Sequence, residues 1–475
     1  MIDFIVKNRT AVILATALMS AAGLFAWHRM PIDAFPDATN QQVMILTAAD
    51  GLGPVDVERQ VTIPVESAMG GLPHVTMVRS TSKTSLSQVV VIFEDHVGTW
   101  FARQLVSERL SMIAGTLPAG AIPKMGPATT GLGEVFQYTL ESPERTLTEL
   151  RTMQDRIVAP RLRSISGVNE VNSFGGKVRQ VEVLLDPNRL AAFGIAPTDV
   201  VEALAADNAN VTGGFIVRGW EQENVRTVGL FGDIEEIGKV VLKSENGIPV
   251  TIDQVAAIVE GSLPRFGAVT RDGRGEAVAG MVIMLQGENA AEVVGRVRAA
   301  LPSIRQALPA DVEINVYYDR VELVDAVIGT IQGALLQGGL LVILLLFLLL
   351  GSLRSAGVTA ISIPVTTLGA FILMKAAGLS ANLMTIGGLA IAIGIVVDGP
   401  IVVVENVVRR VRQSGNAPTT RTIVSATAEV ARPILFSMLI ILIVFVPLFT
   451  LDGMAGKMFG PLALTMVLSM AVSIV

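Results

Sequence analysis

Two carboxylates stand in one of the most apolar stretches of this chain. Asp398 and Glu405 belong to the segment VVDGPIVVVEN, which lies in a run long enough to form a membrane-spanning helix. Seven helical residues turn through about 700°, so the two carboxyl groups share one face within about 20° and lie about 10 Å apart along the axis. An ionised carboxylate at the centre of a bilayer costs at least about 2.5 kcal/mol, so the charge of Asp398 depends on a nearby cation. A group of this kind can serve as a proton relay.

Glycines on the same face predict how these acids are positioned. Gly387 and Gly394 fall on the stripe of Asp398 and Glu405. Small residues let a second helix approach closely, so both acids are expected to face the interior of a helix bundle and not lipid. Two alternatives stay open: a static buried acid that only bonds a neighbouring helix, and the lining of a cation channel. No filter-like loop accompanies the pair, which disfavours the channel.

Six apolar runs are long enough to cross about 30 Å of hydrocarbon. They cover residues 10–27, 329–350, 355–374, 383–404, 433–451 and 458–475. The first run follows a basic patch and could belong to a cleaved signal peptide, but its length favours a retained helix. The last run is still apolar where the sequence stops, so we expect the chain to be a fragment of a longer protein.

Basic residues near the ends of these runs predict the orientation. Most of them fall on one side of the membrane if the N-terminus is cytoplasmic: Lys7, Arg9, Arg354, Arg409, Arg410, Arg412, Arg421 and Arg432. Positively charged short loops favour the cytoplasm. Residues 28–322 are then expected outside the cytoplasm.

Composition excludes several classes of function. Hydrophobic residues make up 51% of the 475 residues and charged residues only 16%, as in a membrane protein with a substantial soluble part. A balance of 36 basic against 42 acidic residues excludes an electrostatic footprint for nucleic acid. There is no cysteine, hence no disulfide and no thiolate ligand in this chain. No nucleophile-histidine-acid set, HExxH, P-loop or dinucleotide fingerprint occurs, so neither an enzyme nor a bound cofactor is predicted.

The long soluble segment contains an internal repeat. Its first copy, residues 29–132, and its second copy, residues 133–176 with 276–322, both alternate as βαββαβ, and LPHVTMVRS corresponds to ISGVNEVNS. Strands of period two and helices with apolar faces favour two split βαβ units. Residues 177–275 interrupt the second copy with short strands and one predicted helix, PTDVVEALAADN, and are expected to project as a separate lobe.

The predicted fold class is therefore a membrane α-helical bundle joined to an α+β soluble part. Residues 1–28 would form the first of six transmembrane helices and residues 323–475 the other five, the last one truncated.

At this level of detail the chain resembles the N-terminal half of a resistance-nodulation-cell division (RND) transporter. The resemblance is carried by GGLAIAIGIVVDGPIVVVENVVRR in the fourth span and, typical of the heavy-metal efflux branch, by MPIDAFPDATNQQV, FARQLVSERL, TTGLGEVFQYTLES and YDRVELV. Drug exporters usually carry two adjacent aspartates in that span. Here Asp398 is followed by Gly399, which favours the metal branch.

The resemblance implies a proton-driven antiporter that exports metal cations from the bacterial inner membrane. Asp398 matches the relay aspartate and Glu405 the second acid of the metal branch, and a second half would supply a lysine partner. The βαββαβ units would be ferredoxin-like porter units in the periplasm, and residues 177–275 the docking lobe. The implied partners are a periplasmic adaptor (membrane fusion) protein, an outer-membrane channel, further copies in a homotrimer, and membrane lipid.

Candidate ligands for the exported ion are few. In divalent-metal members of this branch carboxylates line the porter cleft, a role open to Glu134 and Glu170, although both also suit an exposed strand edge. Met384, within about 40° of the Asp398 stripe, offers a soft thioether for Cu(I) or Ag(I), although packing explains most methionines.

The three histidines complete the candidate ligands. His28, His74 and His96 are scattered along the sequence, at a membrane boundary, at a helix–strand junction and after a strand. Surface or capping roles are expected for all three.

Two other functions are compatible with these features. An exporter of the same fold could carry amphiphilic drugs or biocides, although an aromatic content of 5% argues against an aromatic-lined pocket. An RND-like secretion or assembly factor could instead use the proton gradient to act on protein or lipid.

Overall fold

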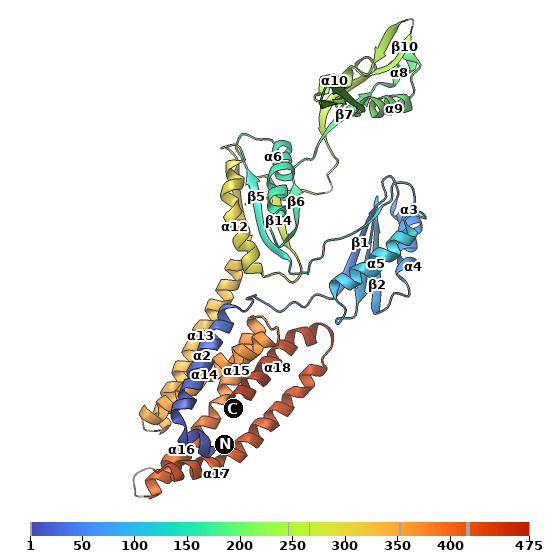
Figure 1. The fold of residues 1–475 in the computed structure, drawn as a ribbon. Helices are drawn as coiled ribbons and strands as arrows, with labels where there is room; N and C mark the ends of the chain where they lie inside the picture. The colour runs from blue at the N-terminus through green and yellow to red at the C-terminus, as the bar shows by residue number, and fades with distance from the viewer. Residues whose placement is uncertain (1, 246, 266, 351–352, 415–418, 475) are drawn as a thin grey trace.

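The structure is a computed structural model that describes residues 2–474 except 246, 266, 351–352 and 415–418. The molecule is elongated (Figure 1): a helical bundle at one end, two α/β units next to it, and a small lobe at the far end. It combines membrane-length helices with mixed α/β structure, which confirms the predicted fold class in outline.

The first α/β unit follows the first long helix. Its elements are β1 (Gln42–Ala48), α3 (Pro54–Val57), η1 (Glu58–Thr62), α4 (Ile63–Met69), β2 (Val75–Lys83), β3 (Leu86–Phe93), α5 (Thr99–Ile113) and β4 (Pro123–Met125). The sheet order is β2-β3-β1-β4, with every pair antiparallel. Alternate residues of β1 and β3, such as Ile45 and Val91, are fully buried against Val65 and Val106 of the helices. The alternation of apolar residues in the sequence thus becomes one covered sheet face.

The second α/β unit has the same strand order. It contains β5 (Glu134–Glu141), α6 (Leu147–Met153), η2 (Gln154–Val158), α7 (Ala159–Arg163), β6 (Val168–Gly175), β13 (Val269–Thr270), β14 (Glu276–Met284), α12 (Ala290–Gln306) and β15 (Glu313–Asp319). The strands lie in the order β6-β14-β5-β15, and β13 adds to the edge of β14. Each unit therefore places its second strand outermost and its first strand between the third and the fourth.

A shared irregularity relates the first helices of the two units. Each helix has a π-helical turn, η1 or η2, that ends two residues before a proline, Pro64 or Pro160. Proline lacks an N–H and its ring crowds the carbonyl four residues earlier, so a widened turn relieves the conflict. The same solution at the same place supports the repeat seen in the sequence.

The inserted segment folds as a small lobe with its own core. Strands β7 (Arg179–Leu185) and β12 (Ala256–Ser262) pair antiparallel and lead out of and back to the second unit. The other elements are α8 (Pro187–Phe193), α9 (Pro197–Asp207), β8 (Thr212–Arg218), β9 (Glu221–Arg226), α10 (Ile234–Gly238), β10 (Val241–Glu245), β11 (Ile248–Thr251) and α11 (Ile252–Val255). The sequence predicted one helix in this segment. It missed three shorter ones, since four to seven residues are too few for a periodic pattern.

The helical part is built from α1 (Ile2–Lys7), α2 (Arg9–His28), α13 (Arg320–Leu350), α14 (Leu353–Ala376), α15 (Leu383–Val396), α16 (Asp398–Ser414), α17 (Thr420–Phe445), η3 (Val446–Thr450) and α18 (Gly453–Ile474). Helix α2 packs on α14, α15 on α18 and α16 on α17. Helix α13 continues directly from β15, so the second unit is joined to the bundle without a loop.

Five helices of the described chain are long and apolar enough to cross a membrane: Arg9–His28, Ser355–Ala376, Leu383–Gln413, Thr420–Thr450 and Gly453–Ile474. The sixth expected span, residues 329–350, lies in α13, whose described residues contribute only the shorter apolar stretch Leu336–Leu345. The predicted count of six is therefore not established by this structure.

Candidate functional site

The predicted relay aspartate lies at a break in its helix. Helix α15 ends at Val396, and α16 begins at Asp398 after the single turn residue Val397. Pro400 has no N–H for the carbonyl of Val396, which explains why the helix is interrupted here. Asp398 occupies the first turn of α16, where the positive end of a helix dipole favours a carboxylate.

Asp398 and Glu405 lie on an exposed stripe of α15 and α16. Both residues are exposed, and no hydrogen bond or ion pair holds either side chain in the part of the chain that the structure describes. A Cβ added at Gly387 or Gly394 would meet open space. Among the described residues no helix of this chain covers these glycines, so the neighbouring helix expected there is not found within this chain. The contact face is turned by one residue, because it is Gly388 whose added Cβ would lie 2.6 Å from the carbonyl oxygen of Leu462 in α18.

A polar cluster beside this stripe fixes α16 to α17. The buried Asn406 donates to the carbonyl of Ala426 at 2.8 Å and to Glu429 at 3.2 Å. Arg410 forms an ion pair with Glu429 at 2.9 Å, and Arg409 donates to Asn406 at 2.6 Å. Sequence reasoning did not single out Asn406 or Glu429. An asparagine directly after Glu405 in an apolar helix was the available signal.

Glu134 and Glu170 lie on strands either side of β14, level with the same β14 residue. Each pairs in register with Ile283 of β14, from opposite sides, so they share a sheet face about 10 Å apart at their Cα atoms. Glu134 is exposed and accepts a hydrogen bond from Gln137 at 3.3 Å. Partial burial raises the pKa of Tyr317, and the nearby Glu134 carboxylate adds to the effect. In the described residues neither glutamate belongs to a group of three or more possible metal ligands.

Met384 lies in the first turn of α15. Its N–H is bonded by the side chain of Asn382, which caps this helix together with Thr385. The methionine is half-buried. The binding of a soft ion by its thioether, predicted from the sequence, therefore stays a prediction.

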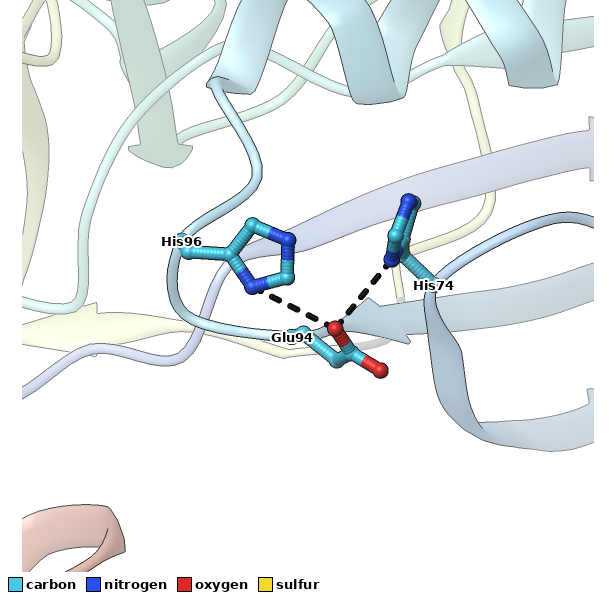
Figure 2. Close-up of side chains that lie close together, drawn as sticks. All are labelled: His74, Glu94 and His96. Carbon is cyan, nitrogen blue, oxygen red and sulfur yellow. Dashed lines mark hydrogen bonds and ion pairs between the residues drawn. The ribbon is translucent and has the colours of Figure 1, made fainter.

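The histidines are not scattered as the sequence suggested. His28 stays apart at the end of α2, but His74 and His96 lie together with Glu94 at one end of the β2–β3 hairpin (Figure 2). The expected surface position of all three histidines is confirmed. The expectation that they are scattered is wrong for His74 and His96. Pairing of Val75 with Phe93 across the hairpin brings the two ends of the segment together, and that register could have been derived from the turn between the strands.

A buried ion pair joins the start of α13 to the segment between α2 and β1, which is in turn bonded to the bundle. Arg320, the first residue of α13, is 4% exposed and donates to Asp33 at 2.6 and 3.1 Å and to the carbonyl of Leu132. Backbone bonds hold the segment around Asp33 against residues 381–383, since Asp33 donates to Ala381 and Leu383 to Ala34. The YDRVELV motif thus marks the junction between the soluble part and the helices.

Known proteins are similar to this chain in sequence and in fold. Residues 1–475 match the AcrB/AcrD/AcrF family, and the chain belongs to that family. Membership confirms the resemblance to RND transporters drawn from the sequence.

Within this family, the chain is similar to proteins named for the efflux of metal cations. It is 42% identical over 486 residues to the cation efflux system protein CzcA of Alcaligenes sp. (strain CT14), covering 99% of this chain and 45% of that protein. It is 38% identical to the cation efflux system protein CusA of Escherichia coli (strain K12), covering 99% of this chain and 46% of the relative. A crystal structure of a heavy metal efflux pump matches all of the chain and 47% of its own, with a TM-score of 0.89 and 35% identity. The chain spans about half the length of these relatives, in their N-terminal half.

Proposed function

We propose that the protein is a proton-driven RND antiporter of the bacterial inner membrane that exports metal cations. The printed names of the relatives support the substrate class, because they are cation efflux proteins and a heavy metal efflux pump. The activity is secondary transport and not enzymatic catalysis, as in the rest of the family.

One observation carries the proposal: the stripe of Asp398 and Glu405 on α15 and α16. Two exposed carboxylates in a membrane-length helix cannot stay ionised against lipid without a large free-energy penalty. The bare glycine positions on the same stripe leave room for a further helix. A cation on that helix would stabilise the carboxylate, and its withdrawal would favour protonation. This cycle converts helix movement into proton uptake and release.

The soluble parts support an envelope-spanning assembly. The two α/β units would be periplasmic porter units with the boundaries expected from the sequence, and the lobe at the far end from the bundle would dock an outer-membrane channel through periplasmic adaptor subunits. Residues Glu134 and Glu170 would contact the cation in the porter, and Met384 would receive a soft ion close to the bundle.

The β8–β9 hairpin supports a homotrimer. It exposes an apolar surface that a soluble monomer rarely leaves in water: Phe215, Ile216, Val217, Val225 and the fully exposed Trp220. Another copy of the chain is the proposed occupant of this surface. Replacing Val217 and Trp220 by aspartate should therefore shift the cross-linked trimer of the intact protein to monomer.

The test of function is transport by the full-length protein in proteoliposomes with an imposed pH gradient. Export of Zn²⁺, Co²⁺, Ni²⁺, Cu⁺ or Ag⁺ should require the gradient, and Asp398→Asn should reduce it to the level of empty liposomes. Glu405→Gln should slow export. Asp452→Asn is the matched control, because Asp452 is an exposed carboxylate of the same bundle outside the stripe.

The outcomes separate the proposal from its alternatives. Gradient-driven export that survives Asp398→Asn would refute the relay. Movement of detergents and biocides without any metal would favour a drug exporter. Loss of a secretion or lipid phenotype in Asp398→Asn, with metal accumulation unchanged, would favour an assembly factor.

A further inference from the structure

Two histidines and a glutamate of the first α/β unit are held together by its hairpin. His74 directly precedes β2, Glu94 directly follows β3, and His96 lies two residues after Glu94. Strands β2 and β3 are antiparallel, with Val75 opposite Phe93. The N–H of Glu94 also bonds the carbonyl of His74 at 2.9 Å. The backbone therefore fixes the distance between the two ends.

The side chains converge on one carboxylate oxygen. The Nδ1 atoms of His74 and His96 lie 3.2 and 3.3 Å from Oε2 of Glu94 (Figure 2). The two rings stand edge to face with centroids 5.0 Å apart, and one ligand atom from each residue lies within 4.8 Å of the others. With metal bonds of about 2.0–2.1 Å, neighbouring corners of a tetrahedral zinc site lie about 3.4 Å apart. Two of the three distances, from each histidine nitrogen to the Glu94 oxygen, thus match neighbouring corners around one ion, and the third is no more than 4.8 Å.

A role in stability does not explain this arrangement. The three side chains are 46%, 46% and 66% exposed, and exposed pairs contribute little to folding. His74 also adopts a φ of 61°, a left-handed conformation that is uncommon for a residue other than glycine. Backbone of this kind clusters at active sites and ligand-binding segments. The exposed side leaves a fourth coordination position open to water.

The site has a defined place in the molecule. Asp95, between Glu94 and His96, forms an ion pair with Lys457 of α18 at 2.5 Å. Lys457 also donates to the carbonyl of Thr39 at 2.8 Å. The loop that carries two of the three ligands is therefore bound to the end of α18 where this helix begins, next to the apolar bundle.

We propose that His74, Glu94 and His96 bind a divalent transition-metal cation of the zinc class beside the start of α18. Two imidazole nitrogens and one carboxylate oxygen suit Zn²⁺, Co²⁺ and Ni²⁺, whereas a site for Cu⁺ or Ag⁺ would favour sulfur ligands. The proposal goes beyond export, because binding here requires neither the proton relay nor the glutamates of the second unit.

The first experiment is Zn²⁺ titration of the purified full-length protein in competition with a chromophoric chelator. The double variant His74→Asn/His96→Ala should lose one equivalent of Zn²⁺. Asparagine is chosen at position 74 because it tolerates a positive φ. His28→Ala is the matched control, since it removes the remaining histidine of this chain and should keep every equivalent. Glu94→Gln should weaken this site by at least about 10-fold, because even outer partners of metal ligands contribute that much.

The second experiment identifies the ligands. X-ray absorption of the protein loaded with Zn²⁺ should show an imidazole contribution that falls in the double variant and not in His28→Ala. An unchanged number of equivalents with unchanged affinity in the double variant would overturn the proposal. So would an unchanged affinity in a folded Glu94→Gln variant, or an unchanged imidazole contribution in the folded double variant.

The two proposals can fail separately. Asp398→Asn should abolish export and leave this binding intact. A protein that binds Zn²⁺ through these histidines and exports no metal would refute the proposed function alone.

Discussion

Replacing Arg320 by methionine should loosen the junction between the second α/β unit and the helical bundle. The guanidinium is buried and makes two bonds to Asp33 and one to the carbonyl of Leu132. Breaking a buried ion pair from one side typically costs about 3–5 kcal/mol, because the other charge is left unpaired. Asp33 is 28% exposed and keeps a bond from the N–H of Ala34 at 2.8 Å, so water and this bond offset part of the loss. We therefore expect about 2–3 kcal/mol.

Hydrogen exchange at the junction measures this free energy locally. The amides of Asp33, Ala381 and Leu383 are bonded between residues 31–34 and 381–383. At about 1.4 kcal/mol per factor of ten, Arg320→Met should speed their exchange about 30- to 150-fold. Arg179→Met is the control, because Arg179 and its partner Glu260 are both 49% exposed and lie in the lobe. It should leave the exchange of these three amides unchanged.

A double-mutant cycle decides whether the ion pair is the cause. Asp33→Asn leaves the buried guanidinium without its anion and should also speed exchange. The variant with both changes has no unpaired charge, so its effect should be smaller than the sum of the two single effects by at least about 1 kcal/mol. Additive effects, or less than about threefold faster exchange in Arg320→Met, would show that the junction depends on other contacts.

Two further predictions concern packing and pH. Gly388→Ala should destabilise the protein by about 1–3 kcal/mol and lower its thermal midpoint, because the added Cβ would lie 2.6 Å from a backbone oxygen of α18. Gly295→Ala is the control: it lies in an exposed and uncrowded turn of α12 and should raise the midpoint. Equal effects of the two substitutions would refute the packing argument. Hydrogen bonds from Arg145, then from Ser142, lower the pKa of Asp311 from 3.8 to about 2. A lowered pKa stabilises the fold above the unfolded value and loses its effect as the pH falls through the folded value. The difference in thermal midpoint between Asp311→Asn and the wild type should therefore be constant above about pH 5 and shrink from about pH 4 toward pH 2, whereas a difference that changes near neutral pH would contradict the assignment.

The α/β units were largely predictable because their sequence pattern is local. The βαββαβ order predicted for residues 29–132 and for residues 133–176 with 276–322 is the order of the main strands and helices in the structure. Period-two and period-3.6 patterns determine which face is apolar, so strands and long helices follow from the sequence. The lobe follows less well, since its short helices depend on caps such as Asp186 and Asp233 more than on periodicity.

The candidate sites show where local pattern fails. Helix periodicity places Asp398 and Glu405 on one stripe, but it does not determine which neighbour that stripe faces. Gly387 and Gly388 differ by about 100° around the helix, and only the tertiary structure reveals that Gly388 contacts α18. His74 and His96 are 22 positions apart in the sequence, and the strand register alone brings them together.

The two α/β units are attached to the helices by contacts of different strength. The second unit is joined through Arg320, which is buried, and through β15, which runs directly into α13. The first unit is joined through Lys457 and Asp95, whose carboxylate is half exposed. Exposed ion pairs contribute about 0–1 kcal/mol, against about 3–5 kcal/mol for breaking a buried one. Any motion of the α/β units relative to the helical bundle should therefore break the contact of the first unit and preserve that of the second. Because Asp95 lies between Glu94 and His96, such a motion would also move the proposed cation site away from α18.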